Sequence, residues 1–370
     1  SQPSGADAEY FWQMARFGAW GAIAREYQVT GDETVAYKAQ RIVEDYLTDT
    51  GGYRSTGTGY GNNANGIRGG FPRSLDAASK NNSFAQVFDI LIKSDSVTPD
   101  YCTALLKNIW DTANYLTVYH SSSGNWRQHE YNSVKLSAQY FPEFTDANAG
   151  NNWTEKAQTV LEELIFANNF SDGSYIEATG GYNVGAFNMF RNYKADVMKT
   201  GGSVSQAYDD MLHKSAYYNA LLFASDGSSI QYGDEMPSTR SAGTFQDICN
   251  WYGDKELEYI ITYGASGTKP DWTSKQWPKS AVTVMRADWT KDSPYLFTNV
   301  RGGGQHSHAD DNGVVVYANG RVLLNDAGIF TYTSSDPYRI WARSSTAHNT
   351  VVMNEKTQNT NGSVGTIHEF

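Results

Sequence analysis

Histidine and aspartate residues are concentrated near the C-terminal end of the sequence. Of the 7 histidines, three occur together with several aspartates in one stretch, which contains His306, His308, Asp310, Asp311, Asp326 and His348. His308, Asp326 and His348 offer two imidazoles and one carboxylate, a ligand set that suits zinc. The same side chains can also form a hydrogen-bonded core cluster without a metal, and their spacing alone favours neither interpretation.

Two further groups of residues with chemical potential lie nearer the N-terminus. The first runs from Asn125 to Glu130 at a predicted helix start, where an asparagine is usually a cap and charged residues usually form a solvated face. The second is Asp172-Gly173-Ser174-Tyr175-Ile176-Glu177, followed by Gly180-Gly181-Tyr182. A tyrosine directly after two glycines can project into a cleft and transfer a proton there.

The composition excludes one class of partner and sets a condition for another. The chain has 370 residues, of which 29 are basic and 40 acidic, and its net charge is -11. Nucleic-acid binders have a basic surface, so nucleic acid is excluded, and any site for an acidic ligand must be a local cationic patch. Aromatic residues make up 14% of the chain, and the flat faces and polar edges of Tyr and Trp suit sugar binding. No apolar run approaches the roughly 18 residues that a membrane span needs. Cys102 and Cys249 can form one disulfide or remain thiols.

Amphipathic helices are predicted from about residue 7 to about residue 263, separated by clusters of Gly, Asn, Ser and Asp. The segments include Trp12–Tyr27, Glu33–Leu47, Leu75–Ile92, Gln128–Gln139, Val184–Val197 and Val204–Leu222. A helical region of this size can bury one face of each helix by pairing helices in a ring or solenoid.

Strands are predicted after a stretch rich in Gly, Pro, Ser and Lys between Gly264 and Ser280, which is the best candidate for a domain boundary. The β-branched or aromatic runs are Val282 to Met285, Tyr295 to Val300, Val314 to Tyr317, Val322 to Leu324 and Thr350 to Met353. Ala318-Asn319-Gly320-Arg321 is typical of a hairpin turn. We expect about six strands, which indicates a β domain that is incomplete at residue 370.

In their order along the chain, these motifs resemble those of the heparinase II/III-like polysaccharide lyases, a family that includes heparin, heparan and alginate lyases. The most specific parts are His306-Ser307-His308-Ala309-Asp310, Asn325-Asp326-Ala327-Gly328 and Arg343-Ser344-Ser345-Thr346-Ala347-His348-Asn349-Thr350. The resemblance implies a multidomain α+β fold, with an incomplete α/α toroid over residues 1–270. An antiparallel β-sheet (β-sandwich) domain would begin over residues 281–370 and continue on a separate chain or beyond residue 370.

The resemblance also implies roles for individual residues. His308, Asp326 and His348 would hold a divalent metal, taken as zinc with a mainly structural role. The implied catalytic residues are Asn125, His129, Tyr182, His306 and Tyr332, with Tyr338 as an alternative to Tyr332. The implied substrate-binding residues are Arg73, Arg127, Glu130 and Arg343. Many relatives have Asn-His where this chain has Asn125-Trp126, so His129 becomes the candidate for the helper histidine.

The implied activity is β-elimination, in which the proton next to a uronate carboxylate is removed and the glycosidic oxygen leaves. Whether Tyr182 or His306 is the base is left open by the sequence. The expected substrate is an acidic polysaccharide, with alginate as the first choice and a heparan- or hyaluronan-type glycosaminoglycan as the alternative. Two rival interpretations are a glycoside hydrolase with a carboxylate pair drawn from Glu130, Glu143 and Glu177, and a non-catalytic carbohydrate-binding protein. A secreted or periplasmic location is expected.

Overall fold

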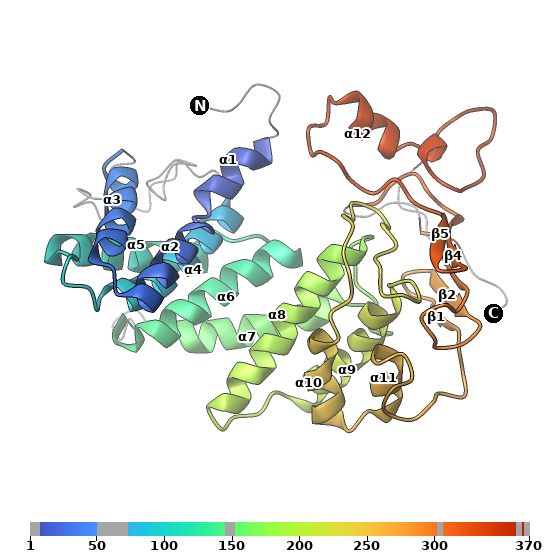
Figure 1. Ribbon diagram of the computed structural model, residues 1–370, viewed down its shortest axis with the longest axis horizontal. Coiled ribbons are helices and arrows are strands. Elements are labelled where there is room, and N and C mark those ends of the chain that lie inside the picture. The colour runs from blue at the N-terminus through green and yellow to red at the C-terminus, as the bar shows by residue number, and fades with distance from the viewer. Residues whose placement is uncertain (1–7, 50–72, 145–151, 302–305, 360–364, 366–370) are drawn as a thin grey trace. The chain divides into compact units, whose positions relative to one another are not determined.

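The computed structural model describes residues 8–49, 73–144, 152–301, 306–359 and 365 (Figure 1). The chain divides into two compact units, Ser1–Leu161 and Glu162–Phe370, and the division falls inside helix α7 (Trp153–Asn168). Helices occupy the sequence before the first strand, and an antiparallel sheet follows, as predicted. The predicted domain limits, residues 1–270 and 281–370, stay a prediction.

The first unit is built from helices in its described residues. They are α1 (Ala8–Ala15), α2 (Trp20–Thr30), α3 (Glu33–Asp49), α4 (Ser74–Leu91), α5 (Pro99–Val118), α6 (Gly124–Tyr140), the 3-10 helix η1 (Pro142–Phe144) and the first part of α7. Helix α5 illustrates how the sequence sets these elements. The Thr98 hydroxyl accepts a hydrogen bond from the backbone N–H of Tyr101, and Pro99 occupies the first turn, where its missing N–H has no cost.

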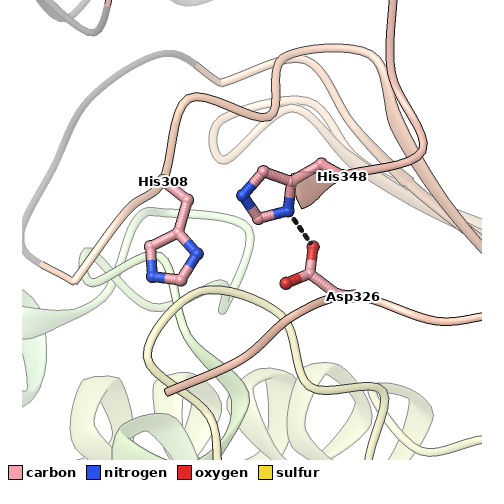
Figure 2. Close-up of side chains that lie close together, drawn as sticks. All are labelled: His308, Asp326 and His348. Carbon is pink, nitrogen blue, oxygen red and sulfur yellow. Dashed lines mark hydrogen bonds and ion pairs between the residues drawn. The ribbon is translucent and has the colours of Figure 1, made fainter. Parts of the chain in front are cut away.

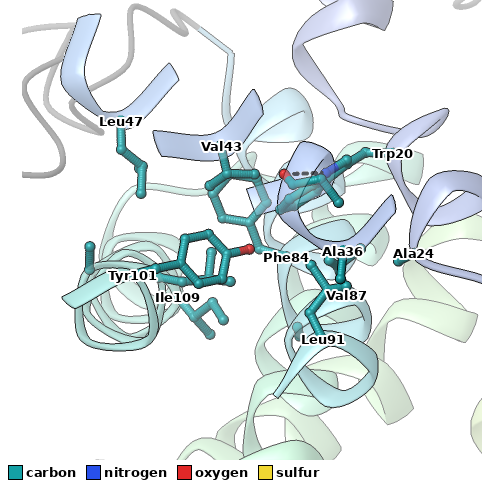
Figure 3. Close-up of a cluster of buried hydrophobic side chains, with 14 of the residues drawn as sticks. Trp20, Ala24, Ala36, Val43, Leu47, Phe84, Val87, Leu91, Tyr101 and Ile109 are labelled. Carbon is teal, nitrogen blue, oxygen red and sulfur yellow. Dashed lines mark hydrogen bonds between the residues drawn. The ribbon is translucent and has the colours of Figure 1, made fainter. Parts of the chain in front are cut away.

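A cluster of aromatic and aliphatic side chains forms the core of the first unit (Figure 3). The rings of Trp20 and Phe84 meet edge to face with 5.3 Å between their centroids. The indole Nε1 of Trp20 donates to the carbonyl oxygen of Ala39 at 3.0 Å, so the buried polar atom keeps a partner. These contacts join α2, α3 and α4 into one packed body.

The helix predicted over Trp12–Tyr27 is two helices, because the chain breaks between α1 and α2. Phe17 lies in the break with φ 56°, a left-handed conformation that costs a non-glycine residue about 1–2 kcal/mol. Its ring packs edge-on against Trp20 and Phe84, with centroid distances of 5.6 and 5.2 Å. Burial of an aromatic side chain is worth about 1.5–3 kcal/mol, so tertiary packing overrides the helical pattern here.

The second unit combines helices with a sheet. Its elements after the remainder of α7 are α8 (Gly180–Lys199), α9 (Gln206–Leu221), α10 (Gly243–Tyr252), α11 (Lys255–Ile261), β1 (Lys275–Trp277), β2 (Val282–Arg286), β3 (Tyr295–Asn299), β4 (Gly313–Ala318), β5 (Arg321–Leu324), α12 (Pro337–Ala342) and the 3-10 helix η2 (Ser345–Ala347). The five strands lie in the order β1-β2-β3-β4-β5, each antiparallel to the next.

One face of the sheet is buried against the helices of its own unit. Alternate side chains of β3 and β4 are buried, and Tyr295 lies opposite Tyr317 while Phe297 lies opposite Val315. The Tyr295 hydroxyl donates to the carbonyl oxygen of Leu221 at 3.1 Å, at the end of α9. The sheet is therefore fixed to the helical part by packing and by buried hydrogen bonds.

The predicted hairpin is confirmed, and it joins β4 to β5. Asn319 and Gly320 have φ angles of 54° and 72°, and Ala318 pairs with Arg321. Two consecutive positive φ angles are what a two-residue type I′ turn needs, and asparagine and glycine are the residues that adopt them most readily. The predicted strands from Val282 to Leu324 are also found.

Two sequence expectations about the strands are wrong. Strand β1 lies inside the stretch that the sequence indicated as a linker, because three residues are too few for an alternating pattern to be recognised. The run Thr350–Met353 forms no strand, although it is β-branched. Met353 makes only an isolated bridge to Lys356, and Val351 is exposed, so no sheet face covers this run among the described residues.

Neither cysteine forms a disulfide, since Cys102 and Cys249 are both free thiols. Among the helices that the structure describes, none combines the length and the apolar character needed to cross a membrane.

The segment Gly233–Glu235 makes close backbone contacts with several other segments of the second unit. The backbone N–H of Asp234 donates to the carbonyl oxygen of His306 at 3.1 Å, and the carbonyl oxygen of Glu235 accepts from the N–H of Ile329, also at 3.1 Å. Gly233 has φ 62°, and a Cβ at this position would lie 2.0 Å from the carbonyl oxygen of Ala178 and 2.7 Å from that of His306. Only glycine fits here, because both neighbouring atoms are backbone.

We expect Gly233→Ala to lower the free energy of unfolding of the second unit by about 3 kcal/mol or more, because it adds a backbone clash to the left-handed conformation. Gly253→Ala is the matched control. Gly253 has φ 61°, and its added Cβ meets no atom within 4 Å, so it should cost only about 1 kcal/mol. Urea unfolding curves of both variants measure the difference, and equal losses would show that Gly233 is not tightly enclosed.

Candidate active site

Tyr182 lies in the first turn of α8, directly after two glycines. The backbone N–H of Gly181 donates to the carboxyl group of Glu235, and a Cβ on Gly181 would lie 2.6 Å from the Glu235 Oε2 atom. Burial raises the pKa of Glu235 to about 7, against the opposing effect of hydrogen bonds from Ser238 and Thr179. The glycine therefore lets the Glu235 side chain reach the start of the helix and fix the backbone next to Tyr182.

The ring of Tyr182 stacks on the imidazole of His306, with 4.0 Å between the centroids and 16° between the planes. Its hydroxyl is hydrogen-bonded to the hydroxyl of Tyr332. Three residues that the sequence predicted to be catalytic, from three separate segments, are thus brought together within the second unit. Tyr182 and His306 are both partly exposed, as groups that meet a substrate must be.

Tyr332 is the partner of Tyr182, and Tyr338 lies elsewhere. Burial raises the pKa of Tyr332 well above its usual range, and the hydrogen bond with Tyr182 adds to this. Tyr332 therefore keeps its proton at neutral pH and can donate it in a hydrogen bond to the Tyr182 oxygen. Tyr338 is exposed and packs against Phe330 and Trp341, with centroid distances of 5.3 Å to each ring.

The buried carboxylate of Asp234 connects the residues beneath this pair. Its Oδ2 atom lies 3.0 Å from His306 Nδ1, and its Oδ1 atom lies 2.9 Å from His308 Nε2. Arg339 donates from both terminal nitrogens, with Nη2 at 2.9 Å from Oδ2. One side chain that is 2% exposed thus receives four hydrogen bonds.

These contacts decide the charge of Asp234. Burial by itself would raise its pKa, but the hydrogen bonds from His306, His308 and Arg339, together with the charge of Arg339, hold the pKa far below its usual range. Because Asp234 stays ionised, it fixes the His306 tautomer with the proton on Nδ1, which leaves Nε2 as the atom that can accept a proton.

Asp234 and Arg339 contact the candidate residues and were not predicted from the sequence. Gly233-Asp234-Glu235 has no periodic pattern around it and reads as an ordinary loop. Arg339 lies on the short helix α12, which was also missed although Asp336-Pro337 is a helix-start signal. The Asp336 carboxylate accepts from the backbone N–H of Tyr338 at 2.8 Å, so Asp336 caps the helix as the signal predicts. The signal therefore indicates helix α12, but it does not indicate that Arg339 pairs with Asp234.

His308, Asp326 and His348 lie together as predicted, and Figure 2 shows their side chains drawn from three segments of the second unit. One ligand atom from each residue can be chosen so that all lie within 4.8 Å of one another. His348 Nδ1 lies 2.8 Å from Asp326 Oδ2, and the side chain of His308 is fully buried. Burial alone would lower the pKa of His348, but its hydrogen bond to Asp326 raises it.

The donor atoms of this cluster fit a divalent metal. His308 Nδ1 and His348 Nε2 are buried and have no hydrogen-bond partner among the described residues, which is unusual for polar atoms inside a protein. The other nitrogen of His308 is bound by Asp234, the carboxylate–histidine arrangement that orients a metal-binding imidazole. Two imidazoles and a carboxylate are ligands that zinc accepts.

The remaining predicted residues of α6 lie in the first unit. Asn125 is buried at the start of the helix. Burial, with a smaller effect from Arg16, lowers the pKa of His129 to about 4, so this imidazole is neutral at physiological pH. Arg127 donates to the carbonyl oxygen of Ser122 at 2.8 Å. Their predicted roles toward a substrate stay predictions.

Glu130 and Arg73 have structural partners within the first unit. Glu130 is fully buried, and its carboxylate accepts from the hydroxyl of Ser74 and from the N–H and hydroxyl of Ser121, the latter two at 2.8 and 2.9 Å. Glu130 therefore ties α4 to the loop before α6, and its predicted contact with substrate stays a prediction.

Arg73 is held between acids and aromatic rings. It pairs with Asp76 and Glu9, both at 2.6 Å, and its guanidinium lies 3.5 Å from the ring centre of Trp12 and 5.5 Å from that of Trp126. Trp126 is 36% exposed. The charge of Arg73 is compensated here, and its predicted role in substrate binding stays a prediction.

We expect Asp234→Asn to destabilise the second unit by about 3 kcal/mol, because the amide leaves the buried Arg339 guanidinium without its counter-charge. Asp226→Asn is the control, since Asp226 is exposed and its carboxylate accepts from the N–H and the hydroxyl of the turn residue Ser228. Urea unfolding monitored by fluorescence gives both values. A loss for Asp234→Asn no larger than that of the control would mean that the carboxylate is not the centre of this network.

Two family models match successive parts of the chain. The family model described as "Heparinase II/III N-terminus" matches residues 1–259, and that described as "Heparinase II/III-like, C-terminal" matches residues 269–366. The chain is 24% identical over 375 residues to the heparin-sulfate lyase of Bacteroides stercoris, covering 95% of this chain and 54% of that protein. It is 23% identical over 360 residues to the heparin-sulfate lyase of Pedobacter heparinus, covering 95% of this chain and 53% of that protein. The chain thus spans about half the length of these curated relatives.

Solved structures share the fold. A crystal structure of heparinase III superposes with a TM-score of 0.85 at 20% sequence identity, covering 97% of this chain and 57% of that chain. Heparan sulfate lyase HepC from Pedobacter heparinus gives a TM-score of 0.67 at 22% identity, covering 96% and 55%. These likenesses confirm the predicted fold class, a helical toroid-type region followed by an antiparallel sheet. Since the two family models together match nearly all of the sequence, the chain belongs to the heparinase II/III family.

Proposed function

We propose that the chain acts as a polysaccharide lyase on a uronate-containing glycosaminoglycan of the heparan sulfate type. The observation that carries the proposal is the hydrogen bond between the hydroxyls of Tyr182 and Tyr332, beside the stacked imidazole of His306. Relatives named heparin-sulfate lyases support this substrate class. They favour the alternative expected from the sequence over alginate, its first choice. A polymer of this kind is met outside the cytoplasm, and we propose a secreted or periplasmic location.

The chemistry requires a strong base and a proton donor. The proton next to a uronate carboxylate is only weakly acidic, and negative charge moves onto the carboxylate as the proton leaves. Tyr182 can act as the base when its phenolate is stabilised. Tyr332, which keeps its proton, donates a hydrogen bond to the Tyr182 oxygen and thereby favours that phenolate.

The stereochemistry of the substrate decides which of Tyr182 and His306 removes the proton and which protonates the leaving oxygen. Where the proton and the leaving oxygen lie on the same face of the sugar ring, Tyr182 can take the proton and then return it to the leaving oxygen. Where they lie on opposite faces, Nε2 of His306 takes the proton and Tyr182 protonates the leaving oxygen. Asp234 supports the second route because it keeps the His306 proton on Nδ1.

The family resemblance implies that Asn125, with Arg127 or His129 as a helper, neutralises the substrate carboxylate, and this role stays a prediction. His129 would act as a neutral N–H donor, because its pKa of about 4 leaves it uncharged at physiological pH. Hydrogen bonds from an amide and a neutral imidazole favour the charged transition state when water is excluded.

We also propose that His308, Asp326 and His348 hold a divalent metal, with zinc as the first choice. The unpaired nitrogens of His308 and His348 support this proposal. A bound zinc ion would supply a cross-link between three segments rather than an activated water. His308 and His306 are separated by one residue, so the cross-link would fix the backbone beside His306.

The metal proposal predicts a loss of stability on chelation. Purified protein should contain about one zinc per chain by elemental analysis, and removal of the metal should lower the melting temperature, because binding to the folded state alone stabilises it. The variant His348→Ala should contain no zinc and should melt at the same temperature with and without chelator. His213→Ala, which alters a histidine of the same unit outside the cluster, should retain the zinc. A wild-type protein with no bound metal after growth in zinc-supplemented medium would contradict the proposal.

The lyase proposal predicts that heparan sulfate yields oligosaccharides with a new carbon–carbon double bond, detected by ultraviolet absorbance. Tyr182→Phe and Tyr332→Phe should lower kcat by at least about 100-fold, since each removes a hydroxyl from the proton-transfer pair. Tyr338→Phe is the control, and it should be fully active because Tyr338 packs away from this pair. Shortened sugars without the absorbance would indicate hydrolysis and would refute the lyase proposal.

A further inference from the structure

A pocket lies next to the tyrosine pair in the second unit, on the side of Tyr332. Its volume is about 360 Å³, and its polar lining includes Ser307, Tyr332, Ser334, Arg339, Arg343 and Thr357. We call it the Arg343 pocket. This volume falls within the range of about 300–1,000 Å³ that is usual for small-molecule sites, so it can hold a sugar unit or a large part of one.

The charges around the Arg343 pocket favour an anion. No aspartate or glutamate is among the residues that line it. Arg339 is neutralised by its two hydrogen bonds to Asp234, which lies behind it. Arg343 has no ion pair among the described residues, and its Nη2 atom donates a hydrogen bond to the carbonyl oxygen of Ser307 at 3.3 Å. The pocket therefore contains one guanidinium whose charge is not compensated, in a chain whose net charge is -11.

The other groups in the pocket suit the same kind of ligand. Ser334 and Thr357 are exposed residues of the lining that carry hydroxyls, and Tyr332, whose hydroxyl is hydrogen-bonded to that of Tyr182, also lines the pocket. A guanidinium binds a carboxylate or a sulfate through paired N–H groups, and nearby hydroxyls can donate to the remaining oxygens. Ile340 and Ala309 add a small apolar surface against which a sugar ring can rest.

We propose that the Arg343 pocket binds an anionic substituent of the sugar next to the bond that is cleaved. The proposal rests on the proposed lyase function and deepens it. Two substituents share the required chemistry, a sulfate ester and the carboxylate of a neighbouring uronate. In either case the pocket selects polymers that carry a second anion close to the reacting sugar.

Direct binding separates this proposal from the lyase activity itself. The probes are two oligosaccharides of the same length, an unsulfated one made of N-acetylglucosamine and glucuronate, and a sulfated heparan one. Dissociation constants are measured by calorimetry on the full chain carrying Tyr182→Phe, which should not cleave them, with and without Arg343→Gln. Arg321→Gln is the matched control, because Arg321 is an exposed arginine of the same unit, in β5, outside the pocket.

We expect Arg343→Gln to raise the dissociation constant by about tenfold or more, with Arg321→Gln close to the parent protein. Arg343→Lys should recover part of the affinity, because it keeps the charge and loses the paired geometry. A rise for the sulfated sugar alone identifies a sulfate, and an equal rise for both sugars identifies a carboxylate. The increase should shrink as salt is added.

Two results would overturn the proposal. One is equal affinity with and without Arg343→Gln for both sugars, and the other is no measurable binding of either sugar. The lyase function fails on a different observation, namely the absence of unsaturated product from the wild-type chain while the sugars still bind. Melting temperatures of the Arg343 variants should match the parent protein, since the side chain is exposed and makes one long hydrogen bond.

Discussion

The second unit depends on the carboxylate of Asp234, which is buried and stays ionised. Taking such a charge out of water costs several kcal/mol, and the cost is offset only when its oxygens are fully hydrogen-bonded. Asp234 meets that condition through His306, His308 and Arg339. The position of the His306 imidazole, the orientation of the His308 imidazole and the burial of Arg339 are therefore consequences of one charge. None of these three side chains could keep its place if Asp234 were protonated.

Glycines make this arrangement possible, because separate backbone segments of the second unit approach within hydrogen-bonding distance of each other. Gly233 crosses the carbonyl groups of Ala178 and His306, and Gly181 leaves room for the side chain of Glu235. Of the adjacent residues, Asp234 hydrogen-bonds to His306, and Glu235 accepts a hydrogen bond from the start of α8. A single short segment in this way positions both members of the Tyr182–His306 pair.

The fold was predictable from sequence wherever a pattern repeats over many residues. Helical stripes, the strands from Val282 to Leu324 and the Asn319-Gly320 turn were found because periodicity and turn chemistry are local properties. The helix break at Phe17 could not be predicted, because it depends on the packing of the Phe17 ring against Trp20 and Phe84 in the folded core. The residue types of His308, Asp326 and His348 allowed a metal site or a metal-free cluster, and the family resemblance favoured the metal. The resemblance also named Tyr182, His306 and Tyr332 as catalytic, whereas their mutual contacts come from the structure. Asp234 and Arg339 were missed because buried ion pairs between distant segments leave no local signal.

Strand β5 has a property that extends beyond the site. It is the last strand of the sheet in the part of the chain that the structure describes, and Val322, Leu323 and Leu324 are exposed along it. An edge of this kind presents unpaired backbone groups together with apolar side chains, which is the surface to which another strand adds most readily. Arg321, at the start of β5, is its only charged residue, and a single charge is a small barrier to such addition. Among the described residues no strand covers this edge, and we expect concentrated solutions of the chain to associate through it unless a further strand occupies the place.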